Sequence, residues 1–94
     1  MTTMIVRHTV SSYDQWKKVY DELAPTRKEK GVIGASVRRD ASDPNTLFVT
    51  HRFNDMGAAT AFAESDELKS AMANAGVAGR PEIWFTEDVE QTPY

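Results

Sequence analysis

The chain has 94 residues, no cysteine and a formal net charge of −3, with charges of both signs spread along it. Its length fits one domain, residues 1–94, and is too short for a doubly wound nucleotide-binding fold. The absence of cysteine excludes a disulfide framework, a zinc knuckle and a thiol nucleophile. The interspersed charge argues against a nucleic-acid partner. Because there is neither a signal segment nor an apolar run of about 18 residues, we expect a cytoplasmic protein that makes no use of a membrane.

The first third of the sequence predicts a strand followed by a helix. Residues 4–10 alternate between two faces, one of them apolar. Ser12 begins a capping box, and the apolar residues after it recur at helical spacing: Trp16, Val19, Tyr20 and Leu23. Pro25 should end or kink this helix, because its ring clashes with the preceding turn. The charged run Arg27–Lys30 is predicted to be a solvated surface.

The middle of the sequence predicts a hairpin and a second helix. Residues 32–39 and 46–53 have strand character, and Asp43-Pro44-Asn45 is a turn signal between them. The second helix begins at Asn54-Asp55. We expect a break in it at Ser65, because a serine followed by two acidic residues is typical of a helix start.

The last segment completes the pattern of a known fold class. Gly76 is placed to end the second helix, Gly79 to make a turn, and residues 82–89 to form a strand before a tail over residues 91–94. The order strand–helix–strand–strand–helix–strand predicts an α+β, ferredoxin-like βαββαβ fold. It is a four-stranded antiparallel-type sheet of order 4-1-3-2 with two helices on one face. We expect its first and third strands to be parallel neighbours at the centre.

Two histidines have equivalent places in the first and third predicted strands. His8 lies between Val6 and Val10, and His51 has the same position within residues 49–53. Side chains alternate along a strand, so each histidine shares the apolar face of its strand. If the two strands are parallel neighbours, both imidazoles lie at similar height on the face that the helices cover.

This arrangement predicts a small pocket between the sheet and the helices. An imidazole titrates near neutral pH, so His8 and His51 are candidates for general acid–base catalysis. The predicted substrate-binding residues come from the apolar sheet face and from helix positions that could face the imidazoles: Val10, Val49, Trp16, Tyr20, Phe62 and Met72. The alternative is a filled core, in which the histidines are structural and these residues, together with Trp84, only pack.

The opposite face of the predicted sheet mixes charged and apolar side chains. It carries Arg7 and Arg52 beside Ile5 and Phe48. A half-apolar face is poorly suited to full exposure. We therefore expect a second copy of the chain to cover it, giving a homodimer in which both arginines are contact or rim residues.

The acidic residues do not form a metal-binding pattern. Asp40, Asp43 and the pair Glu87–Asp88 have no histidine grouped with them. We expect no metal.

A family resemblance is carried by the segment from the third strand into the second helix. It reads Leu47-Phe48-Val49-Thr50-His51-Arg52-Phe53-Asn54-Asp55, followed by Ala59, Phe62 and Ser65-Asp66-Glu67-Leu68-Lys69. With these residues the chain resembles the antibiotic biosynthesis monooxygenase (ABM) family of the dimeric α+β barrel superfamily, over nearly its whole length. The resemblance implies a homodimer, and the family includes cofactor-independent oxygenases that act on polyketide phenols.

The resemblance also implies roles for single residues. Phe53 matches an aromatic of the third strand, commonly Trp, which often lines the pocket in this family. His8 is placed like a strand-one histidine of related polyketide cyclases. Haem-degrading relatives have an axial histidine late in the second helix, where this chain offers Met72, so we do not expect haem degradation.

Three functions follow from these observations. The leading hypothesis is a monooxygenase-like protein without a cofactor that binds or oxidises a small aromatic or polyketide-type molecule. A polyketide cyclase or isomerase of the same fold, with the same base and no oxygen, is the alternative. A non-enzymatic dimeric ligand-binding module is the third.

Overall fold

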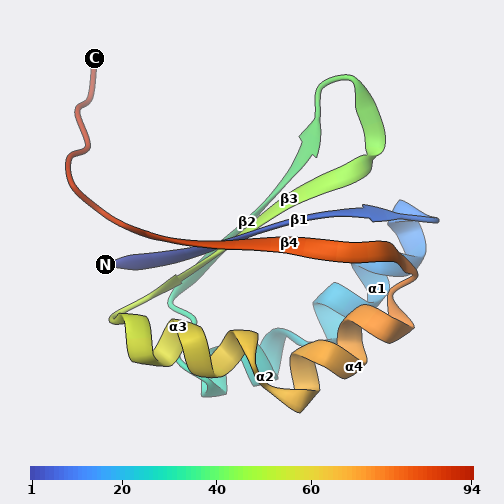
Figure 1. The fold of residues 1–94 in the computed structure, drawn as a ribbon, viewed down its shortest axis with the longest axis horizontal. Coiled ribbons are helices and arrows are strands. Elements are labelled where there is room, and N and C mark those ends of the chain that lie inside the picture. The colour runs from blue at the N-terminus through green and yellow to red at the C-terminus, as the bar shows by residue number, and fades with distance from the viewer.

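Four strands and four short helices make up the chain, and the computed structural model describes all of residues 1–94. Figure 1 shows the four helices together on one face of the sheet and the C-terminal residues running away from it. No helix is long and apolar enough to cross a membrane. The elements in chain order are β1 (Thr2–Val10), α1 (Tyr13–Glu22), α2 (Ala24–Glu29), β2 (Gly34–Asp40), β3 (Asp43–Phe53), α3 (Met56–Ala63), α4 (Asp66–Asn74) and β4 (Val77–Glu87).

The sheet has the order β2-β3-β1-β4, which is the predicted order 4-1-3-2 read from the other edge. All three strand pairs are antiparallel, including β1 with β3. The expectation that the first and third strands are parallel is therefore wrong. The crossover through α1 and α2 makes β1 and β2 run the same way with a gap between them, and the hairpin sends β3 back into that gap.

The helix breaks occur where the sequence predicts them. α1 begins after Ser12, whose Oγ accepts a hydrogen bond from the Gln15 backbone N–H, and it ends at Glu22. Pro25 lies in the first turn of α2, where its missing N–H is tolerated. Ser65 separates α3 from α4 and caps α4 through a bond from the Leu68 N–H.

Every strand differs from its predicted range at one or both ends, most of all at the starts of β3 and β4. The hairpin turn is Ala41–Ser42, and Asp43-Pro44-Asn45 already belongs to β3. β4 begins at Val77, and Gly79 lies inside it with a φ of 71° rather than in a turn. The pairing of β4 with β1 shifts register between Arg7 and Thr9, so this glycine belongs to an irregularity of the strand.

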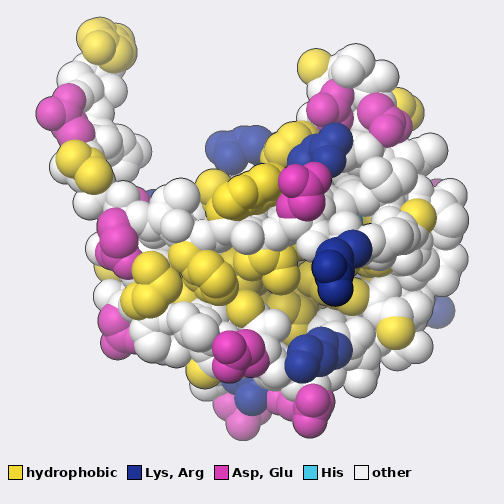
Figure 2. All heavy atoms as spheres, viewed as in Figure 1, with side chains coloured by type: hydrophobic (Ala, Val, Ile, Leu, Met, Phe, Trp, Pro, Cys, Tyr) yellow, Lys and Arg dark blue, Asp and Glu magenta, His cyan; other side chains and the backbone are white.

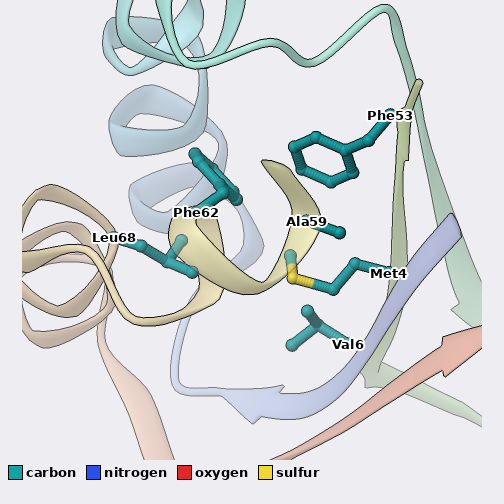
Figure 3. Packing of buried hydrophobic residues seen from close by; sticks show 6 residues of the cluster. All are labelled: Met4, Val6, Phe53, Ala59, Phe62 and Leu68. Carbon is teal, nitrogen blue, oxygen red and sulfur yellow. The ribbon is translucent and has the colours of Figure 1, made fainter. Parts of the chain in front are cut away.

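The core between sheet and helices consists of two clusters of buried residues. Figure 3 shows the first, which joins β1, the end of β3, α3 and α4; its members are Met4, Val6, Phe53, Ala59, Phe62 and Leu68. The second lies toward α1 and contains Val10, Trp16, Leu47, Val49 and Ala75. Only 16 of the 94 residues are buried, so the core is thin.

Candidate functional site

A cavity lies between the two core clusters, because it is lined by residues of both. The volume that the centres of water molecules can occupy in it is about 40 Å³, which is room for roughly three waters. Strands β1 and β3 supply Val6, His8, Val49 and His51, and the helices with their cap residues Leu23 and Ala75 supply the rest: Trp16, Val19, Tyr20, Leu23, Arg27, Leu68, Ala71, Met72 and Ala75.

Both histidines are buried on the helix-covered face of the sheet and border this cavity. His8 is opposite Leu47, and His51 is opposite Met4. The antiparallel pairing therefore offsets them by four residues, roughly 13 Å along the strands. The expectation of similar height is wrong, since it depended on parallel strands. The imidazoles border one cavity from two different levels of the sheet.

Three nitrogen atoms of these imidazoles have no hydrogen-bond partner in the protein. They are Nδ1 and Nε2 of His8 and Nδ1 of His51, and all three are buried. An unsatisfied buried polar atom costs about 1–3 kcal/mol, so such atoms in a native structure call for an explanation. Because both rings border the cavity, a polar ligand or water there would supply the missing partners.

Burial keeps both imidazoles neutral at pH 7. It lowers the pKa of His8, and it lowers the pKa of His51 to about 4, with a further contribution from the positive charge of Arg27. A neutral imidazole has one nitrogen that accepts a proton and one that donates a hydrogen bond. Each ring is therefore in the state that a base requires, although a conjugate acid with a pKa of about 4 makes His51 a weak base.

Arg27 is a site residue that the sequence analysis missed. It is 8% exposed, its guanidinium lies 3.8 Å from the centre of the Tyr20 ring, and its Nη1 donates a hydrogen bond to the Tyr20 carbonyl oxygen. The prediction of a solvated surface holds for Lys28–Lys30 and is wrong for Arg27. The signal was helical spacing: Arg27 follows Tyr20 and Leu23 by seven and four residues, so it continues their inward stripe.

The predicted site residues fall into two groups. His8, His51, Trp16, Tyr20, Val49 and Met72 line the cavity. Val10, Phe53 and Phe62 are buried in the core clusters and do not line it. Trp16 stacks on Tyr20 with ring centres 4.9 Å apart and meets the His8 ring edge-on at 5.8 Å. The aromatic wall of the cavity therefore belongs to α1.

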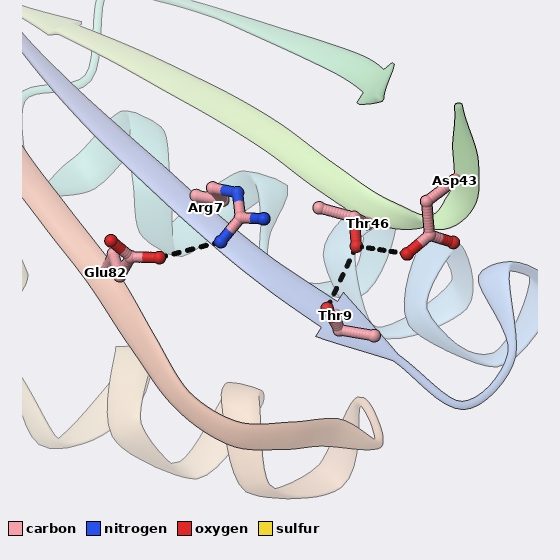
Figure 4. Close-up of polar contacts among 5 residues, drawn as sticks. All are labelled: Arg7, Thr9, Asp43, Thr46 and Glu82. Carbon is pink, nitrogen blue, oxygen red and sulfur yellow. Dashed lines mark hydrogen bonds and ion pairs between the residues drawn. The ribbon is translucent and has the colours of Figure 1, made fainter. Parts of the chain in front are cut away.

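The other face of the sheet carries ion pairs and hydroxyl contacts. Figure 4 shows Arg7 bound to Glu82, at 2.7 Å, and the Thr9 hydroxyl beside that of Thr46. Trp84 is opposite Ile5 on this face and is 45% exposed, so its assignment to the core is wrong. Nowhere in residues 1–94 do three metal-binding side chains gather.

Comparison with solved structures identifies proteins of the same fold. A Caulobacter crescentus protein assigned to the antibiotic biosynthesis monooxygenases is 22% identical, with a TM-score of 0.76 and coverage of 95% of this chain and 90% of that one. SnoaB, a cofactor-independent oxygenase from Streptomyces nogalater, is 19% identical, with a TM-score of 0.77 and coverage of 99% and 97%. A conserved protein from Methanosarcina mazei is 18% identical, with a TM-score of 0.76 and coverage of 94% and 92%.

Identities this low establish only the fold, and no curated protein matches the sequence. The sequence pattern of the antibiotic biosynthesis monooxygenase family, however, matches residues 8–74, from His8 on β1 to the end of α4. This stretch includes most of the sheet and every residue of the cavity except Val6 and Ala75. The chain belongs to the antibiotic biosynthesis monooxygenase family.

Proposed function

We propose that this protein acts without a cofactor as a monooxygenase on an aromatic or polyketide-type molecule held in the cavity between sheet and helices. The observation that supports it is the pair of buried imidazoles, with three unpartnered nitrogens, bordering one largely apolar cavity in a member of this family. SnoaB, which has the same fold, is a cofactor-independent oxygenase.

The proposed chemistry begins with a proton transfer. His8 or His51, each neutral, takes a proton from an electron-rich phenol or anthrone. The resulting phenolate or carbanion passes an electron to O2, and the two radicals combine to a peroxide that takes the proton back from the imidazolium. Loss of water from this hydroperoxide leaves one oxygen atom on the substrate as a carbonyl, so the substrate supplies all the electrons. Trp16, Met72 and Leu68 keep water away from the reacting atoms, and Phe53 and Phe62 support this wall from the adjacent core.

A polyketide-sized molecule requires the cavity to widen beyond its 40 Å³. Helix α4 is suited to this movement, because it has nine residues and lies between the Ser65 break and the left-handed Gly76. It contributes Met72, whose unbranched side chain adapts readily to different shapes. Substrate binding then displaces α4 from the sheet.

The proposed assembly is a homodimer of the single domain formed by residues 1–94. The open sheet face carries Ile5, Phe48 and Trp84 between charged residues. In Figure 1 the β2–β3 hairpin and the C-terminal tail both rise on this side, and Figure 2 shows hydrophobic side chains gathered between them. A second copy seated there would cover these side chains, as in the dimeric α+β barrels.

Two further functions remain supported by specific observations. A cyclase or isomerase would use the same neutral imidazoles to remove an α-proton, with no need for oxygen. A ligand-binding module without catalysis would need only the apolar cavity and its unpartnered imidazole nitrogens.

The test is to replace each histidine by glutamine, singly and together, and to measure oxygen uptake with a panel of phenols and anthrones. We expect a loss of about 10²–10⁴-fold in the double variant, since this is the usual contribution of a general base. The exposed Lys69→Gln change serves as a control for handling and surface charge. Unchanged oxygen uptake in the double variant would remove the histidines from the mechanism, and equal consumption of the substrate with and without oxygen would favour the cyclase or isomerase.

A further inference from the structure

Arg27 is a buried positive charge without a carboxylate partner. It takes no part in any of the four ion pairs of the structure. Its protein contacts are the carbonyl oxygen and the ring of Tyr20, and the hydrogen bond engages one of its five N–H groups. Buried charges are normally paired, because removing an ion from water is costly. Its other N–H groups have no partner in the protein and are not sealed from solvent, so they are free to bind a ligand.

The surroundings of Arg27 have no negative charge. The chain has 14 acidic and 11 basic residues, yet no aspartate or glutamate lines the cavity. Arg27 also borders a groove between α2 and β2 that is open to solvent. The volume of this groove that the centres of water molecules can occupy is about 520 Å³. This groove contains Lys28 and again no carboxylate. An anionic group of a ligand in the inner cavity would therefore meet a guanidinium that has no competing carboxylate on either side.

We infer that the cavity selects an aromatic ligand in its oxyanion form, a carboxylate or an ionised phenol, with the negative oxygen bound to Arg27. This inference rests on the proposed function and names the substrate class of that site. The planar guanidinium suits such oxygens, because it presents paired N–H donors. The remaining wall of the cavity, with Trp16 and Met72, suits the aromatic body.

Binding of the oxyanion by Arg27 also explains how a base as weak as His51 can remove a proton from the substrate. The proton of a phenol O–H moves to an imidazole nitrogen, and the electron pair stays on the phenol oxygen. The guanidinium stabilises that charge, which makes the bound phenol more acidic. The same charge that opposes protonation of His51 thus favours ionisation of the substrate.

Binding of matched probes tests the inference without turnover. The chain has two tryptophans, so Trp84→Phe leaves Trp16 as the only one, and its fluorescence reports on the cavity. The probes are 1-naphthoate and its neutral amide, 1-naphthamide. We expect naphthoate to bind about 10- to 100-fold more tightly than the amide, which is the usual strength of hydrogen bonds to a charged group.

Substitution of the arginine should remove this preference. In Arg27→Met the two probes should bind within about threefold of each other, whereas Arg27→Lys should retain part of the difference because it keeps the charge. Arg80→Met is the matched control, since Arg80 is exposed on β4 and borders neither space. Replacing an unpaired buried cation by an apolar side chain of similar length should leave folding intact, which thermal unfolding checks.

An acidic nitrophenol distinguishes the two kinds of oxyanion. If ionised phenols are the ligands, its phenolate absorbance should develop at lower pH in the wild-type protein than in Arg27→Met. If the shift is absent but naphthoate is preferred, carboxylates are the ligands.

Three results would overturn the inference: equal affinity for naphthoate and its amide, a preference that survives in Arg27→Met, or no binding of either probe. Failure of the proposed oxygenation gives a different result: oxygen uptake is absent, while the Arg27-dependent preference for naphthoate over naphthamide persists.

Discussion

At the residue scale, the two buried imidazoles connect stability with function. Their nitrogens have no partner in the protein and depend on a polar ligand or water in the cavity, and their burial keeps them neutral. Residues that a ligand would satisfy are costly for the fold without it, which is a common property of binding sites. His51 shows the effect most clearly, because its pKa is about 4 in the folded protein and near 6.5 when unfolded.

This difference predicts a specific dependence of stability on pH. Between pH 6.5 and 4 the unfolded chain binds a proton at His51 that the folded chain does not. The free energy of unfolding therefore keeps its full value above pH 6.5 and decreases as the pH falls, by about 3 kcal/mol at pH 4. Urea unfolding of wild type and His51→Phe at several pH values measures it. If the free energies of unfolding of the wild type and of His51→Phe change in parallel over this range, the low pKa assigned to His51 is contradicted.

At the element scale, the short helices are held by their ends. α4 begins after the Ser65 cap and ends at Asn74, and Gly76 follows its C-cap residue Ala75. Gly76 has a φ of 74°, and a Cβ added to it would lie 2.7 Å from the Ser11 Oγ. The backbone N–H of Ser11 also bonds to the Gly76 carbonyl oxygen, so this glycine joins the end of α4 to the end of β1.

Two substitutions separate strain from steric overlap at this junction. Gly76→Ala should lower the free energy of unfolding by somewhat more than the usual loss of about 1–2 kcal/mol for alanine in a left-handed conformation, because the Ser11 hydroxyl must also rotate away from the added Cβ. Gly79→Ala is the matched control: its φ is 71°, but a Cβ there meets nothing within 4 Å. It should show the strain alone. Equal losses in urea unfolding would mean that the Ser11 contact is unimportant.

At the scale of the whole molecule, the sheet has one covered face and one open face. The helices cover the first, and the second carries Trp84 and the ion pair of Arg7 with Glu82 (Figure 4). Burial of a tryptophan and its neighbours on association would add to the small core of the single chain.

The proposed dimer therefore depends on this open face. Light scattering at micromolar concentration should give twice the chain mass for the wild type and the chain mass for Trp84→Glu, since association would bury the new charge. Met56→Glu is the control, because Met56 is 41% exposed but lies on α3, in the helix layer. A monomeric wild type, or dissociation by both variants, would contradict this surface as the interface.

The sequence alone determined the features that depend on neighbouring residues. The caps at Ser12 and Ser65, the break near Pro25, the left-handed end at Gly76 and the inward faces of His8 and His51 all follow from local chemistry and from the alternation of a strand. The strand order followed from the pattern of elements, and the family from the resemblance of the segment between Leu47 and Lys69.

Only the tertiary structure decided how distant residues meet. The antiparallel pairing of β1 with β3 separates the histidines by four residues, and the packing of α2 brings Arg27, on the inward stripe that its spacing indicates, to the wall of the cavity. The same packing leaves Phe53 and Phe62 outside the cavity. These features arise from contacts between segments far apart in the chain, and side-chain periodicity within one segment carries no information about which segment it will face.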